Sequence, residues 1–433
     1  MQEQSTLKIQ KQTLPFLNIS LYLNDIKPVQ SLTIENTSEI DSASLEIKIT
    51  ADLPCIEPFS FTISSVPAKK EVKIPLENLK VNREFLNKLS ETEKANLTIN
   101  VFQNEISILK EAIAINVHPL EHFGGFQVLP ELIAAYVTPN HPYIYHIKRK
   151  AIEILESQGL KTAFEGYQSN DPERVLQIMS SIYSAMQSEE IVYSSLPPGY
   201  EETGQRLRLL NTIQHERFGN CIDISLLFAA CLEAVDLNPI LIIVRGHAFV
   251  GCWLQDDKFS EVINDDKTAI TKRVSKGIRE MAAVEATSVC KGNNIKFSDA
   301  LNTGEAQLVQ KEDFLLSVDI KRARTLRIRP LPLLTNGTET QLDEEALKQT
   351  ETAAMEKHFE IGTIYQDELL QGKQPKTKQK IWERKLLDLS LRNNLLNLHI
   401  TRNMLQLVDI DINNLEDTLS DGKSFSIMPN PNA

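Results

Sequence analysis

The sequence predicts a multidomain α+β protein with an N-terminal β-sandwich, a central α+β domain and a helical C-terminal extension. Apolar and polar residues alternate with a period of two through residues 1–118, which is typical of half-buried strands. Residues 119–330 mix helical and strand patterns, and residues 331–433 carry charged amphipathic helices separated by linkers. A chain of 433 residues is also too long for a single compact core.

Seven short segments carry the alternation of the N-terminal part. They are LNISLYL, QSLTIEN, ASLEIKIT, FSFTIS, EVKIPL, NLTINVFQ and AIAINV. Turn-forming Asn, Asp, Pro and Ser residues separate them, and a helical pattern interrupts them only at NREFLNKLSETEKA. This spacing predicts a β-sandwich of immunoglobulin-like type. The segment holds no cluster of catalytic residue types, so we expect an interaction or spacer domain.

The central domain opens with two predicted helices. The first spans about His141 to Gln158, and the second begins with Asp171 as N-cap and Pro172 at the first helical position. After a loop, Gly219-Asn220-Cys221 leads into a continuous apolar run whose length suits a buried helix. Cys221 therefore lies in the first turn of that helix. The free N–H groups and positive dipole end there favour a thiolate and could hold a developing oxyanion.

A strand pair follows the buried helix. PILIIVRG predicts a strand, Gly246 breaks it, and HAFVGCWL predicts a second strand antiparallel to the first. The start of the second strand can return to the N-terminus of the helix, so we expect His247 to reach Cys221 and take its proton. The next strand-like segment, MAAVEATSV, carries Glu285, our preferred group for orienting the imidazole. Asp265 and Asp266 are nearer in sequence but lie in a charged turn.

The stretch GNCIDISLLFAACLEAVDLNPILIIVRGHAFVGCWL resembles the core of transglutaminases and papain-like cysteine proteases. In that family a Cys opens a helix, a His begins a strand, and an acid on the following strand, usually Asp in a D-P-T context, completes the triad. Here Glu285-Ala286-Thr287 stands in that place, so the acid is one carbon longer and the Pro is absent. The resemblance implies a catalytic Cys221, His247 and Glu285.

A second resemblance covers more of the chain. Segments including AAYVTPNHP, SSLPPGYEETGQRLR, FLLSVDIKRARTLRIRPLP and WERKLLDLSLRNNLLNL resemble the N-terminal region of large bacterial superfamily 1 helicase-like proteins, in which a domain of unknown function precedes the motor. No P-loop GxxxxGK[ST] is present, so the resemblance implies a truncated chain or a motor encoded apart. It also implies, by association alone, a role in defence against phage.

Other groups have two interpretations that stay open. Gln168 and Gln205 are candidates for a side-chain oxyanion donor or for plain loop hydrogen bonding. The arginines of KRARTLRIRP either protect a strand edge or contact nucleic-acid phosphates; they are Arg322, Arg324, Arg327 and Arg329. The stripe of Trp382, Leu386, Leu389 and Leu396 must bury against the body, a second copy or a helicase motor.

Composition bounds the remaining expectations. The net charge of −12 argues against bulk attraction to nucleic acid or anionic membrane. Five cysteines without a CxxC pair or zinc-type spacing indicate free thiols in a reducing compartment and no metal or cofactor. No apolar run is long enough to span a membrane and no signal peptide is evident, so we expect a cytoplasmic protein.

Two functions remain open on the sequence. The first is a cysteine hydrolase or acyl-transfer module that acts on peptide or isopeptide bonds of a protein substrate, attached to a helicase-type system. The second is a catalytically silent transglutaminase-like adaptor that binds protein or nucleic acid.

Overall fold

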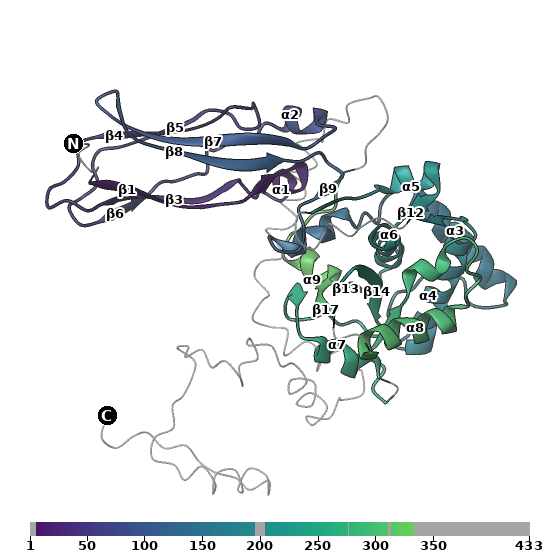
Figure 1. Cartoon of the computed structure of the whole chain (residues 1–433). Helices are drawn as coiled ribbons and strands as arrows, with labels where there is room; N and C mark the ends of the chain where they lie inside the picture. The colour runs from purple at the N-terminus through teal and green to yellow at the C-terminus, as the bar shows by residue number, and fades with distance from the viewer. Residues whose placement is uncertain (1–5, 195–203, 276, 311–312, 333–433) are drawn as a thin grey trace, which may run out of the picture. The chain divides into compact units, whose positions relative to one another are not determined.

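The computed structural model describes residues 6–194, 204–275, 277–310 and 313–332. The chain divides into two units, residues 1–371 and 372–433, and all described residues belong to the first. They form a mixed α+β structure with several sheets (Figure 1). The predicted helical extension and its Trp382 stripe lie outside the described residues, apart from Leu331 and Pro332.

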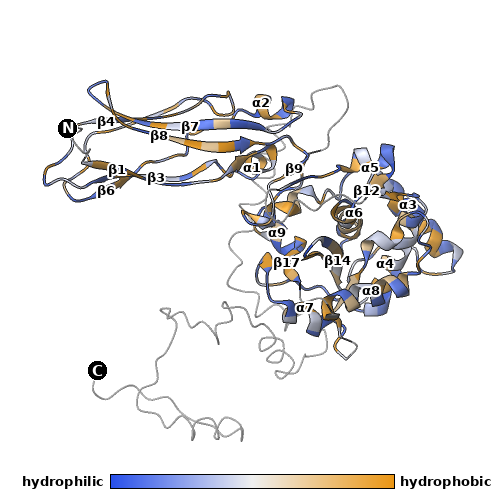
Figure 2. Cartoon of the chain, in the orientation of Figure 1, coloured by the Kyte–Doolittle hydropathy of each residue, from blue (hydrophilic) through white to orange (hydrophobic). Residues whose placement is uncertain are grey.

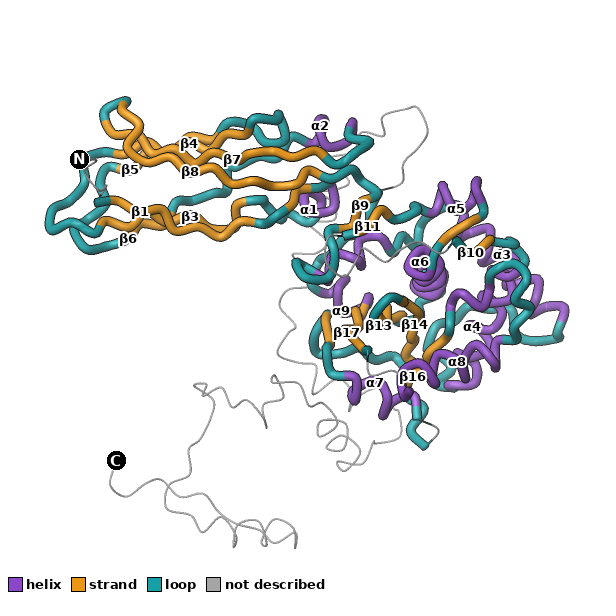
Figure 3. The backbone as a smooth tube through the Cα atoms, viewed as in Figure 1, coloured by secondary structure: helices purple, strands orange, loops and turns teal. Residues whose placement is uncertain are grey.

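Two sheets make up the N-terminal β-rich part (Figure 3). One is five-stranded, in the order β2-β8-β7-β4-β5, and the other is three-stranded, in the order β1-β3-β6. The five-stranded sheet contains β2 (Phe16–Leu17), β4 (Leu45–Ala51), β5 (Phe59–Ile63), β7 (Glu93–Gln103) and β8 (Ile106–Val117). The three-stranded sheet contains β1 (Leu7–Thr13), β3 (Val29–Asn36) and β6 (Glu71–Lys73).

Alternating burial explains why these segments are strands. Ile47 and Ile49 on β4 and Leu97 and Ile99 on β7 are fully buried, while the residues between them are more exposed. Antiparallel pairing brings Ile49 opposite Ile99, so one face of the sheet is apolar. Figure 2 shows the same alternation of colours along β7 and β8.

One predicted strand is wrong. LNISLYL forms helix α1 (Ile19–Leu23), because the Asn18 side chain accepts a hydrogen bond from the Leu21 amide and caps the helix. A second short helix, α2 (Arg83–Lys88), lies in the segment for which we predict a helix, and Asn82 caps it in the same way. Strand β1 was not among the predicted strands.

A five-stranded antiparallel sheet with the order β15-β17-β13-β14-β16 organises the α+β part. Its strands are β13 (Pro239–Val244), β14 (His247–Trp253), β15 (Ile263–Asn264), β16 (Met281–Val284) and β17 (Phe314–Asp319). Both faces are buried, since Leu241 and Ile243 belong to one hydrophobic cluster and Ile240 and Ile242 to another. The continuous apolar run of β13 reflects this double burial.

Helices surround this sheet. They are η1 (Pro130–Tyr136), α3 (Pro142–Ser157), α4 (Pro172–Gln187), α5 (Leu210–Glu216), α6 (Cys221–Glu233), α7 (Lys267–Val274), η2 (Ala286–Val289), α8 (Phe297–Gln310) and α9 (Ile320–Thr325). As predicted, Asp171 caps α4 and Pro172 opens it. Helix α6 lies between β13 and β14 on one side and α3 and α4 on the other (Figure 3), which explains why it is apolar on every face.

Two small strand pairs complete the α+β part. β10 (Val192–Tyr193) pairs in parallel with β12 (Phe218–Gly219), and β9 (His122–Phe123) pairs antiparallel with β11 (Gln205–Arg206). The β10–β12 pair places Tyr193 opposite Gly219, two residues before Cys221. Among the described residues, none of the helices combines the length and apolarity that crossing a membrane requires.

Candidate active site

Cys221 is the first residue of helix α6, and a capping box fixes the start of that helix. The Asn220 side chain accepts a hydrogen bond from the Asp223 amide at 3.1 Å, and the Asp223 carboxylate accepts one from the Asn220 amide at 3.0 Å. These bonds use the N–H groups of Asn220 and Asp223. Within the described residues, the amides of Cys221 and Ile222 have no acceptor, so they remain available to bind an anion.

Asp223 also joins helix α6 to the segment that precedes it. Its carboxylate accepts hydrogen bonds from the Arg208 amide at 2.9 Å and from the Arg208 guanidinium at 3.0 Å, and that guanidinium stacks 4.3 Å from the Phe218 ring centre. Burial raises the pKa of Asp223, and the hydrogen bonds from Arg208 and Asn220 oppose this rise. Asp223 is therefore a fully buried anchor for the start of α6.

His247 is the first residue of β14, directly after the two-residue turn of the β13–β14 hairpin. The Ser225 hydroxyl, one turn into α6, lies 2.7 Å from the Cys221 carbonyl oxygen and 3.1 Å from the Ala248 carbonyl oxygen. It thus connects the residue that carries the thiol to the strand that carries the imidazole. This contact holds the first turn of α6 against the first residues of β14.

Glu285 follows β16, the neighbour of β14 in the sheet, and caps the short helix η2. Its Oε2 lies 2.8 Å from Nε2 of His247. Its Oε1 accepts hydrogen bonds from the amide of Thr287 at 3.0 Å and from the Thr287 hydroxyl at 2.6 Å. The side-chain amide of Gln307 on α8 also donates to Oε2. Glu285 is 5% exposed, Thr287 and Gln307 are half-buried, and the His247 side chain is 18% exposed.

The electrostatics of the group favour a charged imidazole. Burial lowers the pKa of His247, but hydrogen bonds to Cys221 and Glu285 and the negative charges of both groups outweigh burial and raise it to about 9. Burial raises the pKa of Glu285, but the hydrogen bonds and charge of His247 and the hydrogen bonds from Thr287 bring it below its ordinary value. Because Glu285 occupies Nε2 of His247, Nδ1 is the ring nitrogen left to interact with Cys221.

Tyr193 is a further neighbour of the thiol. Strand β10 is held to the residues before Cys221 by hydrogen bonds from the Val192 amide to the Arg217 carbonyl and from the Ser194 amide to the Gly219 carbonyl. Burial, the charge of Cys221 and a hydrogen bond to that residue raise the pKa of the Tyr193 phenol to about 12. Tyr193 is 42% exposed and Cys221 is 6% exposed, so the tyrosine is in contact with solvent while the cysteine is almost fully covered.

The two glutamines proposed as oxyanion donors lie in different places. Tyr167, the neighbour of Gln168, hydrogen bonds to Asn238 and Trp253, which lie at the end of the β13–β14 pair away from His247. Trp253 is six positions along β14 from His247, a span of about 20 Å. The structure therefore holds the segment of Gln168 at the far end of the sheet from His247 and does not bring it to Cys221. Gln205 lies on β11, three residues before Arg208, and so belongs to the segment anchored on α6.

The four arginines do not form a strand edge, because residues 320–325 are helix α9. The Arg324 guanidinium binds both carboxylate oxygens of Glu233, at 2.8 and 3.0 Å. It also donates to the carbonyl oxygens of Ala134, Val137 and Ile328. Arg324 is therefore turned into the fold rather than toward a phosphate backbone. Arg322 and Arg329 are half-buried, and Arg327 is exposed.

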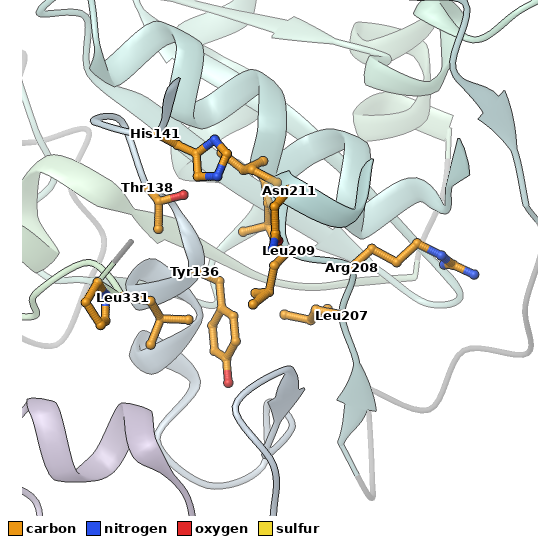
Figure 4. Close-up of a pocket in the computed structure, with 11 residues that line it drawn as sticks. Tyr136, Thr138, His141, Leu207, Arg208, Leu209, Asn211 and Leu331 are labelled. Atoms are coloured by element: carbon orange, nitrogen blue, oxygen red, sulfur yellow. The ribbon is translucent and has the colours of Figure 1, made fainter. Parts of the chain in front are cut away.

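One pocket lies apart from the Cys221, His247 and Glu285 group (Figure 4). It is a small cavity of about 30 Å³, lined by Tyr136, Thr138, His141, Leu207, Arg208, Leu209, Leu210, Asn211, Leu226, Leu331 and Pro332. Neither Cys221, His247 nor Glu285 lines it. In the described part of the chain no cluster of three or more metal-ligating side chains occurs, and all five cysteines are free.

Comparison with known proteins assigns no activity. A family model described as a protein of unknown function (DUF4011) matches residues 385–433, which lie outside the described residues. No curated protein matches the chain. The matched residues include the whole LLDLSLRNNLLNL run, which belongs to the second resemblance.

Several residues of the site escaped the sequence analysis. The capping box has a local signal, the spacing Asn220-x-x-Asp223 directly before an apolar run, and could have been found. Ser225 is indistinguishable in sequence from other small residues of a buried helix. Gln307 lies 22 residues beyond Glu285 on a different helix, and no pattern connects the two.

Proposed function

We propose that the α+β part is a transglutaminase-like cysteine hydrolase or acyl-transfer module, with Cys221 as nucleophile, His247 as its base and Glu285 as the group that orients His247. The observation that carries the proposal is the 2.8 Å contact between the Glu285 carboxylate and Nε2 of His247. Cys221, at the N-terminus of α6, helps to raise the pKa of that imidazole. The β-rich part, a proposed immunoglobulin-like sandwich, would act as an interaction or spacer domain.

The first half of the reaction forms a thioester. The Cys221 thiolate attacks the carbonyl carbon of an amide, and the carbonyl oxygen becomes an oxyanion. The amides of Cys221 and Ile222 at the start of α6 suit that oxyanion. Gln205, on the segment that Arg208 ties to α6, is the side-chain candidate. The protonated His247 gives its Nδ1 proton to the leaving amine, the C–N bond breaks, and the acyl group stays on sulfur.

The second half regenerates the thiolate. Neutral His247 takes a proton from water or from an incoming amine, which attacks the thioester carbonyl. Water yields a carboxylic acid, and an amine yields a new amide. In both cases the C–S bond breaks and the thiolate is released. Glu285 stays ionised throughout and stabilises the imidazolium, which fits the fall in its pKa caused by His247 and Thr287.

A catalytically silent adaptor is the second candidate. The observation in its favour is that Cys221 is only 6% exposed and has Tyr193 as a neighbour. In this proposal the α+β part keeps the arrangement of an enzyme but binds a protein partner without cutting it.

Incubation with a peptide library tests the two candidates. Mass spectrometry would detect new termini if a peptide bond is hydrolysed and joined peptides if an acyl group is transferred. The hydrolase proposal predicts products that appear with the native chain and are absent with Cys221→Ala. Peptides retained equally by the native chain and by Cys221→Ala, with no new product, would favour the adaptor instead.

A further inference from the structure

All the hydrogen-bonding directions of the Glu285 carboxylate are occupied. Thr287 supplies two donors to Oε1, at 3.0 and 2.6 Å. Oε2 accepts from Nε2 of His247 at 2.8 Å and from the side-chain amide of Gln307. Two donors on each oxygen hold the plane of the carboxylate in one orientation. Apart from His247 on β14, Gln307 is the member of this set that comes from another element, helix α8.

A glycine brings that helix close enough. Helix α8 packs against β16, and Gly304 faces the strand. A Cβ atom added at Gly304 would lie 2.5 Å from the carbonyl oxygen of Ala283 and 2.9 Å from the amide nitrogen of Val284. Any larger residue would therefore move the helix off the strand. Gln307 lies three residues later on the same helix face, and Glu285 directly follows Val284, so this close approach brings the two side chains together.

The amide of Gln307 is used at one end only. Its Nε2 donates to Glu285, while its Oε1 is buried without a hydrogen-bond partner in the described part of the chain. A rotated amide would point its oxygen at the carboxylate and be repelled, so the orientation is fixed. A buried acceptor without a partner is unfavourable, and an apolar side chain of the same length would avoid it. The donor contact to Glu285 explains why a glutamine stands here.

We propose that Gln307 is a positioning residue for the Cys221 reaction, and that Gly304 brings it close to Glu285. Together with Thr287, Gln307 fixes the Glu285 carboxylate so that Oε2 faces Nε2 of His247. This inference rests on the function proposed above. With the carboxylate locked, the proton of neutral His247 stays on Nε2, and Nδ1 faces Cys221 as the acceptor. Without Gln307 only the Thr287 donors on Oε1 orient the carboxylate, and Oε2 faces His247 with no second donor to hold it.

The substitution Gln307→Met tests this role, because methionine has a similar length and no strong donor. The measurement is the rate at which iodoacetamide labels Cys221, followed by mass spectrometry from pH 5 to pH 10. In the native chain we expect a step near pH 9, where His247 loses its proton. In Gln307→Met we expect labelling at pH 7 to fall about tenfold and the step to move to lower pH. Asn302→Ala, at an exposed position of the same helix, should leave the profile unchanged.

Gly304→Ala gives a second test through the backbone. It changes no side chain of the site chemically, but it pushes α8, and with it Gln307, away from β16. The pH profile of Cys221 labelling should therefore shift in the same direction as in Gln307→Met. A Gln307→Met profile that superposes on the native one would overturn the inference while leaving Cys221 as nucleophile. If instead native Cys221 reacts no faster than Cys231, the proposed function itself fails, and that result is separate from any effect of Gln307.

Discussion

The Nε2 atom of His247 lies 2.8 Å from Oε2 of Glu285, although 38 residues separate them in the chain. The order of strands in the sheet explains the distance. β14 begins with His247, β16 runs antiparallel beside it and ends just before Glu285, and the two residues therefore meet at one end of the sheet. Helix α6 packs on β14 and on η2, which Glu285 caps, and it starts at Cys221. This packing places the elements that carry a thiol, an imidazole and a carboxylate next to one another.

Glu285→Gln should weaken the base without disturbing the fold. The neutral amide keeps the length of the side chain but removes the charge that helps to raise the pKa of His247. We expect the pKa of His247 to fall and labelling of Cys221 by iodoacetamide at pH 7 to slow by about tenfold or more. Circular dichroism of the variant should match the native chain. Labelling at the native rate would show that Glu285 does not act on the pair.

Asp223→Asn should lower the stability of the fold. The substitution keeps the shape but weakens the bonds to Arg208 and to the Asn220 amide. It also leaves the half-buried Arg208 guanidinium without its counter-charge. Loss of one partner from a buried pair costs about 3 kcal/mol of unfolding free energy. Urea denaturation measures this loss. Asp265→Asn, in an exposed turn, is the matched control, and an equal effect of both changes would refute the anchoring role.

Arg324→Ala should destabilise the fold rather than alter nucleic-acid binding. The guanidinium joins Glu233 to three main-chain carbonyls, all of which would lose a donor. We expect a loss of about 3 kcal/mol in the free energy of unfolding. Arg327→Ala, at an exposed position, should cost less than about 0.5 kcal/mol. A filter-binding assay with single-stranded DNA that detects loss of binding in a fully stable Arg324→Ala variant would contradict this account.

The stability of the fold should fall as the pH rises through 9. The pKa of His247 is raised from 6.5 to about 9 in the folded chain, so its protonated form is stabilised by folding. This contribution is fully present below pH 6.5 and is lost as the pH rises through 9. Chemical denaturation at several pH values gives the unfolding free energy of the native chain and of His247→Asn. The difference between the two slopes of unfolding free energy against pH measures this contribution. Identical slopes between pH 7 and pH 10 would contradict the raised pKa.

Local patterns predicted the elements that carry the site. The continuous apolar runs after Cys221 and before Gly246 and the strand-like segment after the hairpin each predict an element. The structure has a helix and strands there. LNISLYL shows the limit of such patterns. Its alternation is typical of a strand, but the capping bond of Asn18 starts a helix instead.

Contacts between distant segments could not be predicted in the same way. Gln168 and Gln205 were equal candidates because sequence distance does not report which end of a sheet a loop reaches. Tyr167 ties the first to the far end of the β13–β14 pair, whereas Arg208 ties the second to α6. Gln307 depends on Gly304 meeting β16, which is a property of packing and not of any local pattern.

The most direct test of the central claim is the labelling rate of Cys221 by iodoacetamide at pH 7, relative to Cys231 on the same helix. The account predicts that Cys221, at the helix N-terminus beside a protonated His247, reacts at least about 100 times faster than Cys231, whose burial raises its pKa. It also predicts that His247→Ala removes most of this difference. Equal rates for the two thiols, or an unchanged Cys221 rate in His247→Ala, would contradict the claim that these two residues form a nucleophile and its base.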